Sequence, residues 1–390
     1  MFARRTNWDL SPNALTLALK EHGGSGQELL DLTASNPTCV GQEYPARQIA
    51  CALADERALS YEPAAKGLLA ARQSVASYYA QQGIGVDPER LVLTVSTSEA
   101  YSYCFRLLCD PDDEVLVPSP SYPLFEFLAD IQDVRLVPFE LVYDEGWQIE
   151  FESLRRGISA RSRAVLVVQP NNPTGSYVKR WVLERLNVLC REHQLALIAD
   201  EVFLDYNVES GERLSFVGNT GVLSFALSGL SKISGLPQMK MAWIACSGPG
   251  DLAADAMNRL EVIADTYLSP NAPVQLATAV LLEVRHSIQR QLGQRIRDNL
   301  AELDAQLSRQ QFCHRLRVEG GWYVVLRIPA ICADEEFVLA LLRKTNVLVH
   351  PGHFFNFRGG CFLVLSLITP ETVFGEGLRR LITLSGMMNT

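Results

Sequence analysis

The sequence has no long apolar run, no paired cysteine motif and no excess of positive charge, and each absence excludes a class of protein. No apolar stretch approaches the ~18 residues that a membrane-spanning helix requires. The opening MFARRTNWDLS lacks the apolar core of a secretory signal peptide. Nine cysteines, an odd number without a C-x-x-C pair, are typical of a reduced, intracellular protein. We therefore expect a cytoplasmic protein without a membrane anchor.

A basic surface and a dinucleotide-binding glycine loop are also missing. The formal net charge is −9, whereas nucleic-acid binding needs clustered lysine and arginine. No G-x-G-x-x-G follows an early strand, which argues against a nicotinamide dehydrogenase. We predict no nucleic-acid partner and no metal site. The 390 residues, 48% of them hydrophobic, suffice for a large α/β domain with a smaller partner.

Short apolar runs alternate with helical stretches between about residues 91 and 245. Strands that are apolar on both faces and separated by helices indicate a parallel sheet covered on both sides. The runs are LVLTV (91–95), EVLVP (114–118), AVLVV (164–168), LALIAD (195–200) and GVLSFAL (221–227). The predicted fold class is α/β, with a three-layer αβα large domain, residues 46–275, built on a mostly parallel sheet.

The pattern changes from about residue 275 onward. A long amphipathic helix, about 275–309, precedes WYVVLRIP, a helix near 334–344, the strand CFLVLSLI and a last helix. This mixture is typical of a smaller α+β domain. We expect it to contain residues 1–45 and 276–390.

Polar residues follow the predicted strands, where an open parallel sheet binds its ligands. Thr97 and Ser98 open a helix, whose N-terminus can hold a phosphate, although a serine here can equally be a simple cap. Asn172 lies in the rigid turn QPNNPTG, which either aims its amide into a cleft or is a bare turn. Neither feature alone indicates a function.

Asp200 and Lys232 follow two further strands. A carboxylate at the end of a buried strand is costly without a cation or strong donor, so Asp200 either caps a helix or pairs with a protonated ring nitrogen. Desolvation of Lys232 in SGLSKISG would favour the neutral amine that forms a Schiff base. A single lysine is usually a surface charge. Four such features at one sheet edge favour the covalent role.

Three motifs in order, NNPTG (171–175), DEVF (200–203) and SGLSK (228–232), resemble those of class I/II aminotransferases, fold-type I pyridoxal-phosphate-dependent enzymes. YEPAAKGLLAARQSVASYY (61–79) and PSPSYP (118–123) support the resemblance, which runs from about residue 28 to the end of the chain.

The resemblance implies a homodimeric aminotransferase that uses pyridoxal 5′-phosphate. It would move an amino group from an amino acid, or a related amine, to a 2-oxo acid. A β-eliminating carbon–sulfur lyase is the alternative, because it would use the same cofactor and lysine. A cofactor-binding regulator is disfavoured, since the segment before the resemblance shows no helix-turn-helix pattern and the chain is acidic.

The resemblance also implies a role for each matching residue. Lys232 would form the Schiff base and carry the proton, and Asp200 would keep the ring nitrogen protonated. Asn172 would donate to the phenolic oxygen of the ring, and Tyr122 would stack on its face. The phosphate would be bound by Thr97, Ser98, Ser231, Lys240 and, from the neighbouring subunit, Tyr61.

The sequence departs from the family pattern near the cofactor and the substrate. Phe203 stands where a tyrosine is usual, so a phenol that would hydrogen-bond the cofactor is absent. Lys240 replaces an arginine, which keeps the charge but loses the bidentate geometry. Ser35 stands where a small glycine usually lies near the substrate carboxylate.

The departure with the largest consequence is Val364, which stands where an arginine usually binds the substrate α-carboxylate. Either Arg358 takes that carboxylate, or the reacting amine has no neighbouring carboxylate. Arg358 is equally compatible with an exposed loop charge. We expect His350 and His353, in HPGHFF, near the same cleft, either as structural groups or as hydrogen-bond partners of a substrate.

Overall fold

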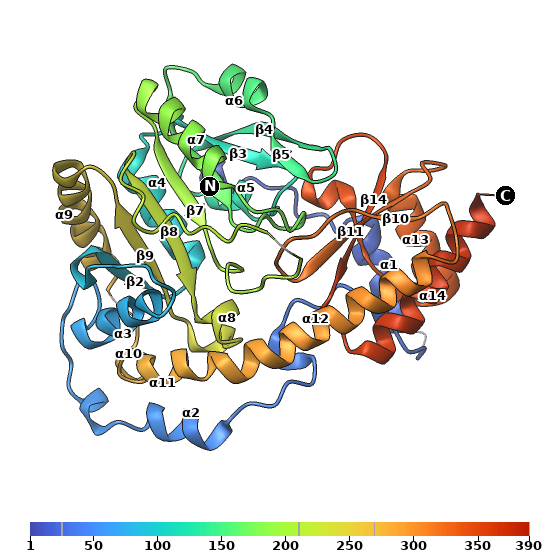
Figure 1. The fold of residues 1–390 in the computed structure, drawn as a ribbon, viewed down its shortest axis with the longest axis horizontal. Coiled ribbons are helices and arrows are strands. Elements are labelled where there is room, and N and C mark those ends of the chain that lie inside the picture. Colours follow the sequence, from blue (N-terminus) through green and yellow to red (C-terminus); the bar gives the residue numbers. More distant parts are fainter. Residues whose placement is uncertain (25, 210, 269, 390) are drawn as a thin grey trace.

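The computed structural model describes residues 1–24, 26–209, 211–268 and 270–389, and an eight-stranded sheet forms the centre of its larger part (Figure 1). The strand order is β2-β9-β8-β7-β6-β3-β4-β5. The strands are β2 (Leu91–Thr94), β3 (Glu114–Ser119), β4 (Arg135–Tyr143), β5 (Trp147–Ile149), β6 (Ser162–Val168), β7 (Ala196–Asp200), β8 (Ser224–Gly229) and β9 (Ala242–Ser247).

The sheet is mostly parallel, as predicted. Strands β8, β7, β6, β3 and β4 run in one direction, whereas β9 is antiparallel to both its neighbours and β5 is antiparallel to β4. The sequence did not predict β4, β5 or β9. Since the parallel strands share one direction, their carboxyl ends meet along one edge of the sheet.

Helices cover both faces of this sheet and give three layers. One face packs against α4 (Thr97–Leu108), α5 (Phe125–Asp130) and α9 (Gly250–Tyr267), and the other against α3 (Leu69–Ala80), α6 (Phe151–Gly157) and α7 (Arg180–Glu192). Alternate residues of β6 face opposite layers: Val165 and Val167 belong to one apolar cluster, Leu166 to the other. The predicted αβα architecture is therefore confirmed.

The smaller part contains a four-stranded antiparallel sheet in the order β10-β11-β14-β13, on the right in Figure 1. Its strands are β10 (His314–Arg315), β11 (Tyr323–Ile328), β13 (His350–Pro351) and β14 (Cys361–Ser366). The helices beside it are α1 (Ala14–Gly23), α13 (Asp334–Thr345) and α14 (Glu371–Met388).

The long helix predicted over 275–309 is divided into three segments. They are α10 (Ala272–Leu276), α11 (Thr278–Glu283) and α12 (Arg285–Leu307), and α12 runs from the large part to the small one (Figure 1). The remaining helices α2 (Ala46–Leu53) and α8 (Leu230–Ile233) belong to the large part. Among the described residues, no helix combines the length and apolar character needed to cross a bilayer.

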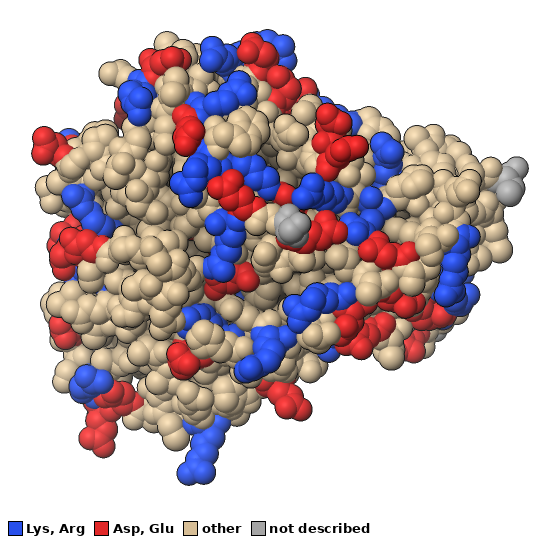
Figure 2. Space-filling view, viewed as in Figure 1, with Lys and Arg blue, Asp and Glu red and all other residues tan. Residues whose placement is uncertain are grey.

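The N-terminal segment joins the C-terminal one. Strand β1 (Leu30–Asp31) pairs in parallel with β12 (Val347–Leu348). We therefore propose the division predicted from the sequence, with 46–275 as the large domain and 1–45 with 276–390 as the small domain. Trp8 crosses that division, because its indole N–H donates to Asp130 at 2.8 Å. Acidic and basic side chains are interspersed over the face seen in Figure 2.

Candidate active site

The carboxyl ends of the parallel strands open onto a cavity of about 290 Å³ between the two parts of the chain. The large part contributes residues from the ends of β6, β7 and β8, from α4 and from the loop before α5. The small part contributes Ser35, Tyr323, His350, Phe354 and Phe355. From the large part, the lining includes Thr97, Tyr122, Asn172, Asp200, Phe203, Ser231 and Lys232.

Lys232 lies in α8, one turn after β8, and its amine is largely enclosed. Nζ donates to the Ser35 carbonyl at 3.4 Å and lies 4.6 Å from the centroid of the Trp322 ring and 5.4 Å from that of Phe203. Burial lowers the pKa of Lys232 to about 8, and the nearby Asp200 carboxylate counteracts that shift. A lysine in this setting supplies neutral amine near physiological pH.

Asp200 ends β7 and is buried, with two donors on its carboxylate. The Tyr101 hydroxyl donates to Oδ2 at 2.8 Å and the Val202 N–H donates to Oδ1 at 3.1 Å. Burial raises the pKa of Asp200, while these donors and Lys232 lower it. The residues that follow form turns rather than a helix, so Asp200 caps no helix. It presents a restrained acid to the cavity.

Asn172 follows β6, and its side chain points into the cavity from a tightly held loop. The preceding Asn171 donates to the Pro120 carbonyl at 3.1 Å and to the Thr174 hydroxyl at 2.9 Å. The buried Oδ1 of Asn172 has no hydrogen-bond partner among the described residues. Because buried polar atoms are normally paired, this amide is available to a polar ligand.

The N-terminus of α4 reaches the cavity beside these groups. The Ser96 hydroxyl accepts from the Glu99 N–H at 3.2 Å, and the Glu99 carboxylate accepts from the Val95 N–H at 2.8 Å. These two hydrogen bonds, to the cap residue and to the residue before it, hold the first turn of the helix. The N–H groups of Thr97 and Ser98 lie at that turn, where the helix dipole favours an anion such as a phosphate.

The other residues predicted for the cofactor divide into two groups. Tyr122 and Ser231 line the cavity with Thr97. Lys240 does not: it ends a short 3-10 helix in left-handed conformation, with φ of 51°, and is exposed. Tyr61 is 78% exposed on the surface of its own chain and does not line its own cavity.

Two residues predicted for the substrate lie outside the cavity. Arg358 is exposed and forms an ion pair with Glu140, 3.7 Å from guanidinium to carboxylate. His353 is turned toward the start of α13, where its backbone N–H and Nδ1 contact the Asp334 carboxylate at 2.7 and 2.9 Å. Ser35, by contrast, lines the cavity.

The cavity wall contributed by the small part is aromatic, and the sequence did not single out most of it. Tyr323 begins β11, and Phe354 and Phe355 lie in a 3-10 turn after β13. His350 lies beside them, with its ring centroid 5.7 Å from that of Phe355. The run HFF reads as ordinary core sequence, so only the fold identifies these side chains as cavity walls.

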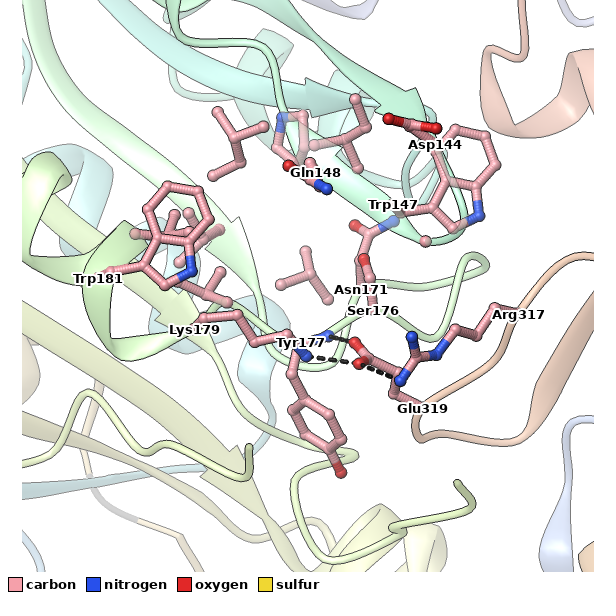
Figure 3. Close-up of a pocket in the computed structure, with 18 of the residues that line it drawn as sticks. Asp144, Trp147, Gln148, Asn171, Ser176, Tyr177, Lys179, Trp181, Arg317 and Glu319 are labelled. Carbon is pink, nitrogen blue, oxygen red and sulfur yellow. Dashed lines mark hydrogen bonds and ion pairs between the residues drawn. The ribbon is translucent and has the colours of Figure 1, made fainter. Parts of the chain in front are cut away.

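A second cavity, of about 310 Å³, is lined by Asn171 of the NNPTG loop and by residues that follow this loop (Figure 3). In the figure, Lys179, Tyr177 and Arg317 converge on Glu319. The carboxylate contacts Lys179 Nζ at 2.5 Å and the Tyr177 N–H at 3.0 Å, with Arg317 at 3.6 Å. Lys179 is thus held in an ion pair. The desolvated amine and restrained acid belong to the first cavity.

Comparison with known proteins identifies the family. The family model described as "Aminotransferase class I and II" matches residues 27–373. An alanine aminotransferase of Mycobacterium tuberculosis is 29% identical over 343 residues, which cover 85% of this chain and 79% of the relative. The glutamate-pyruvate aminotransferase AlaA of Haemophilus influenzae is 26% identical, over 85% of this chain and 84% of its own.

Solved structures agree on the fold. The alanine aminotransferase of Pyrococcus furiosus superposes with a TM-score of 0.89 over all of both chains, at 23% identity. A mutant aspartate aminotransferase of Thermus thermophilus gives a TM-score of 0.81 at 25% identity, over 97% of this chain and 98% of its own.

Proposed function

The chain belongs to the class I and II aminotransferase family and is an aminotransferase, and on that premise we propose that pyridoxal 5′-phosphate binds in the cavity around Lys232. One observation carries the proposal: a desolvated lysine, a restrained carboxylate, an unpaired amide and a helix N-terminus converge on one cavity. Each matches a different part of that cofactor. The cofactor, when bound, supplies an electron-accepting ring that protein side chains lack.

Four side chains would hold the ring. The Lys232 amine would bind its aldehyde carbon, and Asp200 would accept a hydrogen bond from its protonated nitrogen. The NH2 group of Asn172, whose side chain lines the cavity, would donate to the phenolic oxygen. Tyr122 covers a ring face. Phe203 offers no hydroxyl to the cofactor, and its ring packs edge-on against Trp322, with centroids 5.2 Å apart.

The phosphate would lie at the start of α4. Thr97 and Ser98 supply N–H and hydroxyl groups there, and Ser231 adds a hydroxyl from α8. Lys240, which is exposed and does not line the cavity, would add positive charge without a bidentate contact. Tyr61 of a second copy would complete this set of phosphate-binding residues, which requires a homodimer. Its 78% exposure in a single chain supports that arrangement.

The protein's part in the reaction is to move one proton and exclude water. Lys232 takes the proton from the reacting carbon of the substrate and returns it to the carbon that receives the nitrogen. Burial raises the pKa of Asp200, and the hydrogen bonds from Tyr101 and Val202 oppose that shift, so they favour the charged carboxylate that would stabilise positive charge opposite it. The fully buried Trp322 keeps water from the lysine.

We propose an amino donor and a 2-oxo acid acceptor as the substrates, supported by the alanine and glutamate-pyruvate aminotransferases among the relatives. A cytoplasmic location stays a prediction from the sequence composition.

The test is transfer of nitrogen by the cofactor-loaded enzyme from a panel of amino acids and amines to a 2-oxo acid, detected as the new amino acid. Lys232→Ala should abolish transfer, and Lys20→Ala, an exposed lysine on α1, should not change it. Pyruvate released from a donor without any acceptor would identify a β-eliminating lyase and contradict the proposal.

A further inference from the structure

The charge of the cavity decides which substrates it accepts. Of the described side chains that line it, Asp200 and Lys232 are the acid and the basic amine, and both are committed to the cofactor in the proposed function. Burial lowers the pKa of His350 below the ordinary value for histidine, although the nearby Asp31 opposes the shift, so the neutral imidazole is favoured. No described lining side chain is left to neutralise a substrate carboxylate.

The small sheet presents an uncharged face toward the cavity. In register across its strands, Val364 of β14 lies opposite Val325 of β11 and His350 of β13. Cross-strand partners point to the same side of a sheet, so these three side chains share the side on which His350 reaches the cavity. Tyr323, two residues before Val325, is on that side too and lines the cavity. The side chains of the small sheet that face the site are therefore apolar or neutral.

Three arginines close to this wall in sequence or fold are either paired or exposed away from the cavity. Arg358 pairs with Glu140, and Arg327 is exposed at the far end of β11. Arg295 of α12 donates to the Val40 carbonyl at 3.0 Å and pairs with Glu371 at 3.2 Å. None of the three lines the cavity.

Aromatic side chains form much of the cavity wall that the small part contributes. Tyr323 packs edge-on against Phe203 with ring centroids 6.2 Å apart, and Phe354 lies 6.4 Å from His350 by the same measure. Desolvating a carboxylate against such a wall without a cationic partner is strongly unfavourable. An apolar or aromatic group is instead stabilised there.

We propose that this site selects amines whose reacting carbon carries no carboxylate, with an uncharged apolar or aromatic substituent against Tyr323, His350 and Phe354. This substrate class rests on the proposed function and deepens it. The corresponding aldehyde or ketone is the product of the first half-reaction. A 2-oxo acid reacts in the same cavity only at high concentration, because no described side chain of this chain compensates its carboxylate.

The half-reaction balances. The amine carbon is oxidised to a carbonyl: its nitrogen passes to the cofactor aldehyde, which is reduced to an amine. Its hydrogen leaves as a proton to Lys232, which delivers that proton to the former aldehyde carbon of the cofactor. The aldehyde oxygen leaves as water when nitrogen binds that carbon, and a second water supplies the oxygen of the new carbonyl.

The direct test compares 2-phenylethylamine with L-phenylalanine, which differ only in the carboxylate. Each is mixed with the loaded enzyme, and loss of the cofactor's absorbance band gives the rate at limiting substrate. We expect 2-phenylethylamine to react at least about tenfold faster, a difference of about 1.4 kcal/mol. A faster reaction of L-phenylalanine would overturn the substrate class.

A binding measurement decides the same question without turnover. Titration calorimetry compares 3-phenylpropionate with its neutral amide, neither of which can donate nitrogen. Equal or tighter binding of the amide supports the proposal, and tighter binding of the carboxylate overturns it. Because this result does not depend on nitrogen transfer, it separates failure of the substrate class from failure of the proposed function.

Val364→Arg tests whether the missing positive charge at this position determines the substrate class. Val364→Met is the matched control, a long side chain without charge. We expect the arginine variant to shift the rate ratio at least about tenfold toward L-phenylalanine and the methionine variant to leave it unchanged. Equal shifts in both variants would contradict the assignment. Since Val364 is fully buried and the arginine variant can fail to fold, the wild-type comparisons stand on their own.

Discussion

The protonation of Lys232 gives a test at the scale of one residue. Burial lowers its pKa from 10.5 to about 8, so the neutral amine that attacks an aldehyde increases up to that pH and is nearly complete above it. We predict that the rate of cofactor attachment to the apoenzyme rises about tenfold per pH unit below 8 and then levels.

Stopped-flow absorbance measures this rate, and N-α-acetyl-lysine serves as control. The free amine has its ordinary pKa, so its reaction should keep accelerating to about pH 10. A protein rate that also climbs to pH 10 would show that Lys232 is not desolvated.

Tyr101 is a positioning residue that the sequence did not indicate. Its hydroxyl donates to Asp200, so Tyr101→Phe removes a hydrogen bond from the charged carboxylate and raises its pKa. We predict that kcat falls about tenfold with little change in KM, and that the acid limb of the pH–rate profile moves upward. Tyr267→Phe, on the half-exposed surface of α9, should leave the profile unchanged. An unshifted acid limb for Tyr101→Phe would show that the hydroxyl is merely structural.

At the scale of elements, the sequence was sufficient to predict which polar residues lie at the carboxyl ends of the parallel strands. Asn172, Asp200 and Lys232 each follow an apolar run, and parallel strands bring such positions to one edge whatever the loops do. Strand β4 was missed because its residues are largely exposed and Pro138 interrupts the apolar pattern. Its placement depends on pairing with β3, which local sequence does not encode.

The sequence also could not predict the orientation of side chains on loops. Arg358 lies beside Gly359 and Gly360, both with positive φ, and the turn that they form directs the arginine to solvent. The aromatic wall resembles core sequence, and only β11, β13 and the turn after β13 bring it to the cavity at the ends of β7 and β8. Contacts between segments far apart in the chain decide both outcomes.

The NNPTG loop depends on an ion cluster at the second cavity. Glu319 is mostly buried and contacts both Lys179 and the Tyr177 N–H, so it joins the segment before β11 to this loop (Figure 3). We predict that Glu319→Ala lowers the free energy of unfolding by about 3 kcal/mol, because Lys179 loses its partner.

Urea denaturation measures the change, with Asp255→Ala as the control. Asp255 pairs with Arg259 on the exposed surface of α9, where both side chains are more than half exposed, and its loss should cost under about 1 kcal/mol. Similar losses in both variants would show that the buried cluster does not hold the loop.

The whole molecule is proposed to be a homodimer with shared sites, and complementation tests this. Lys232→Ala and Tyr61→Ala are each expected to be impaired. In a mixed dimer, one of the two sites has its own Lys232 and the partner's Tyr61. Random subunit exchange makes about half of the dimers mixed, so mixing should restore up to about one quarter of the wild-type activity.

Light scattering reports the assembly in parallel. A mixture that regains nothing while mixed dimers form would contradict the exchange of Tyr61. A monomeric active enzyme would contradict the shared site.

The central claim is that Lys232 binds the cofactor covalently. The most direct measurement treats the loaded enzyme with borohydride, which reduces a Schiff base to a stable bond, and locates the added mass by peptide mapping. The modified peptide is predicted to contain Lys232 and to be absent from Lys232→Ala. A modification at another lysine, or none in a preparation that transfers nitrogen, would contradict the claim.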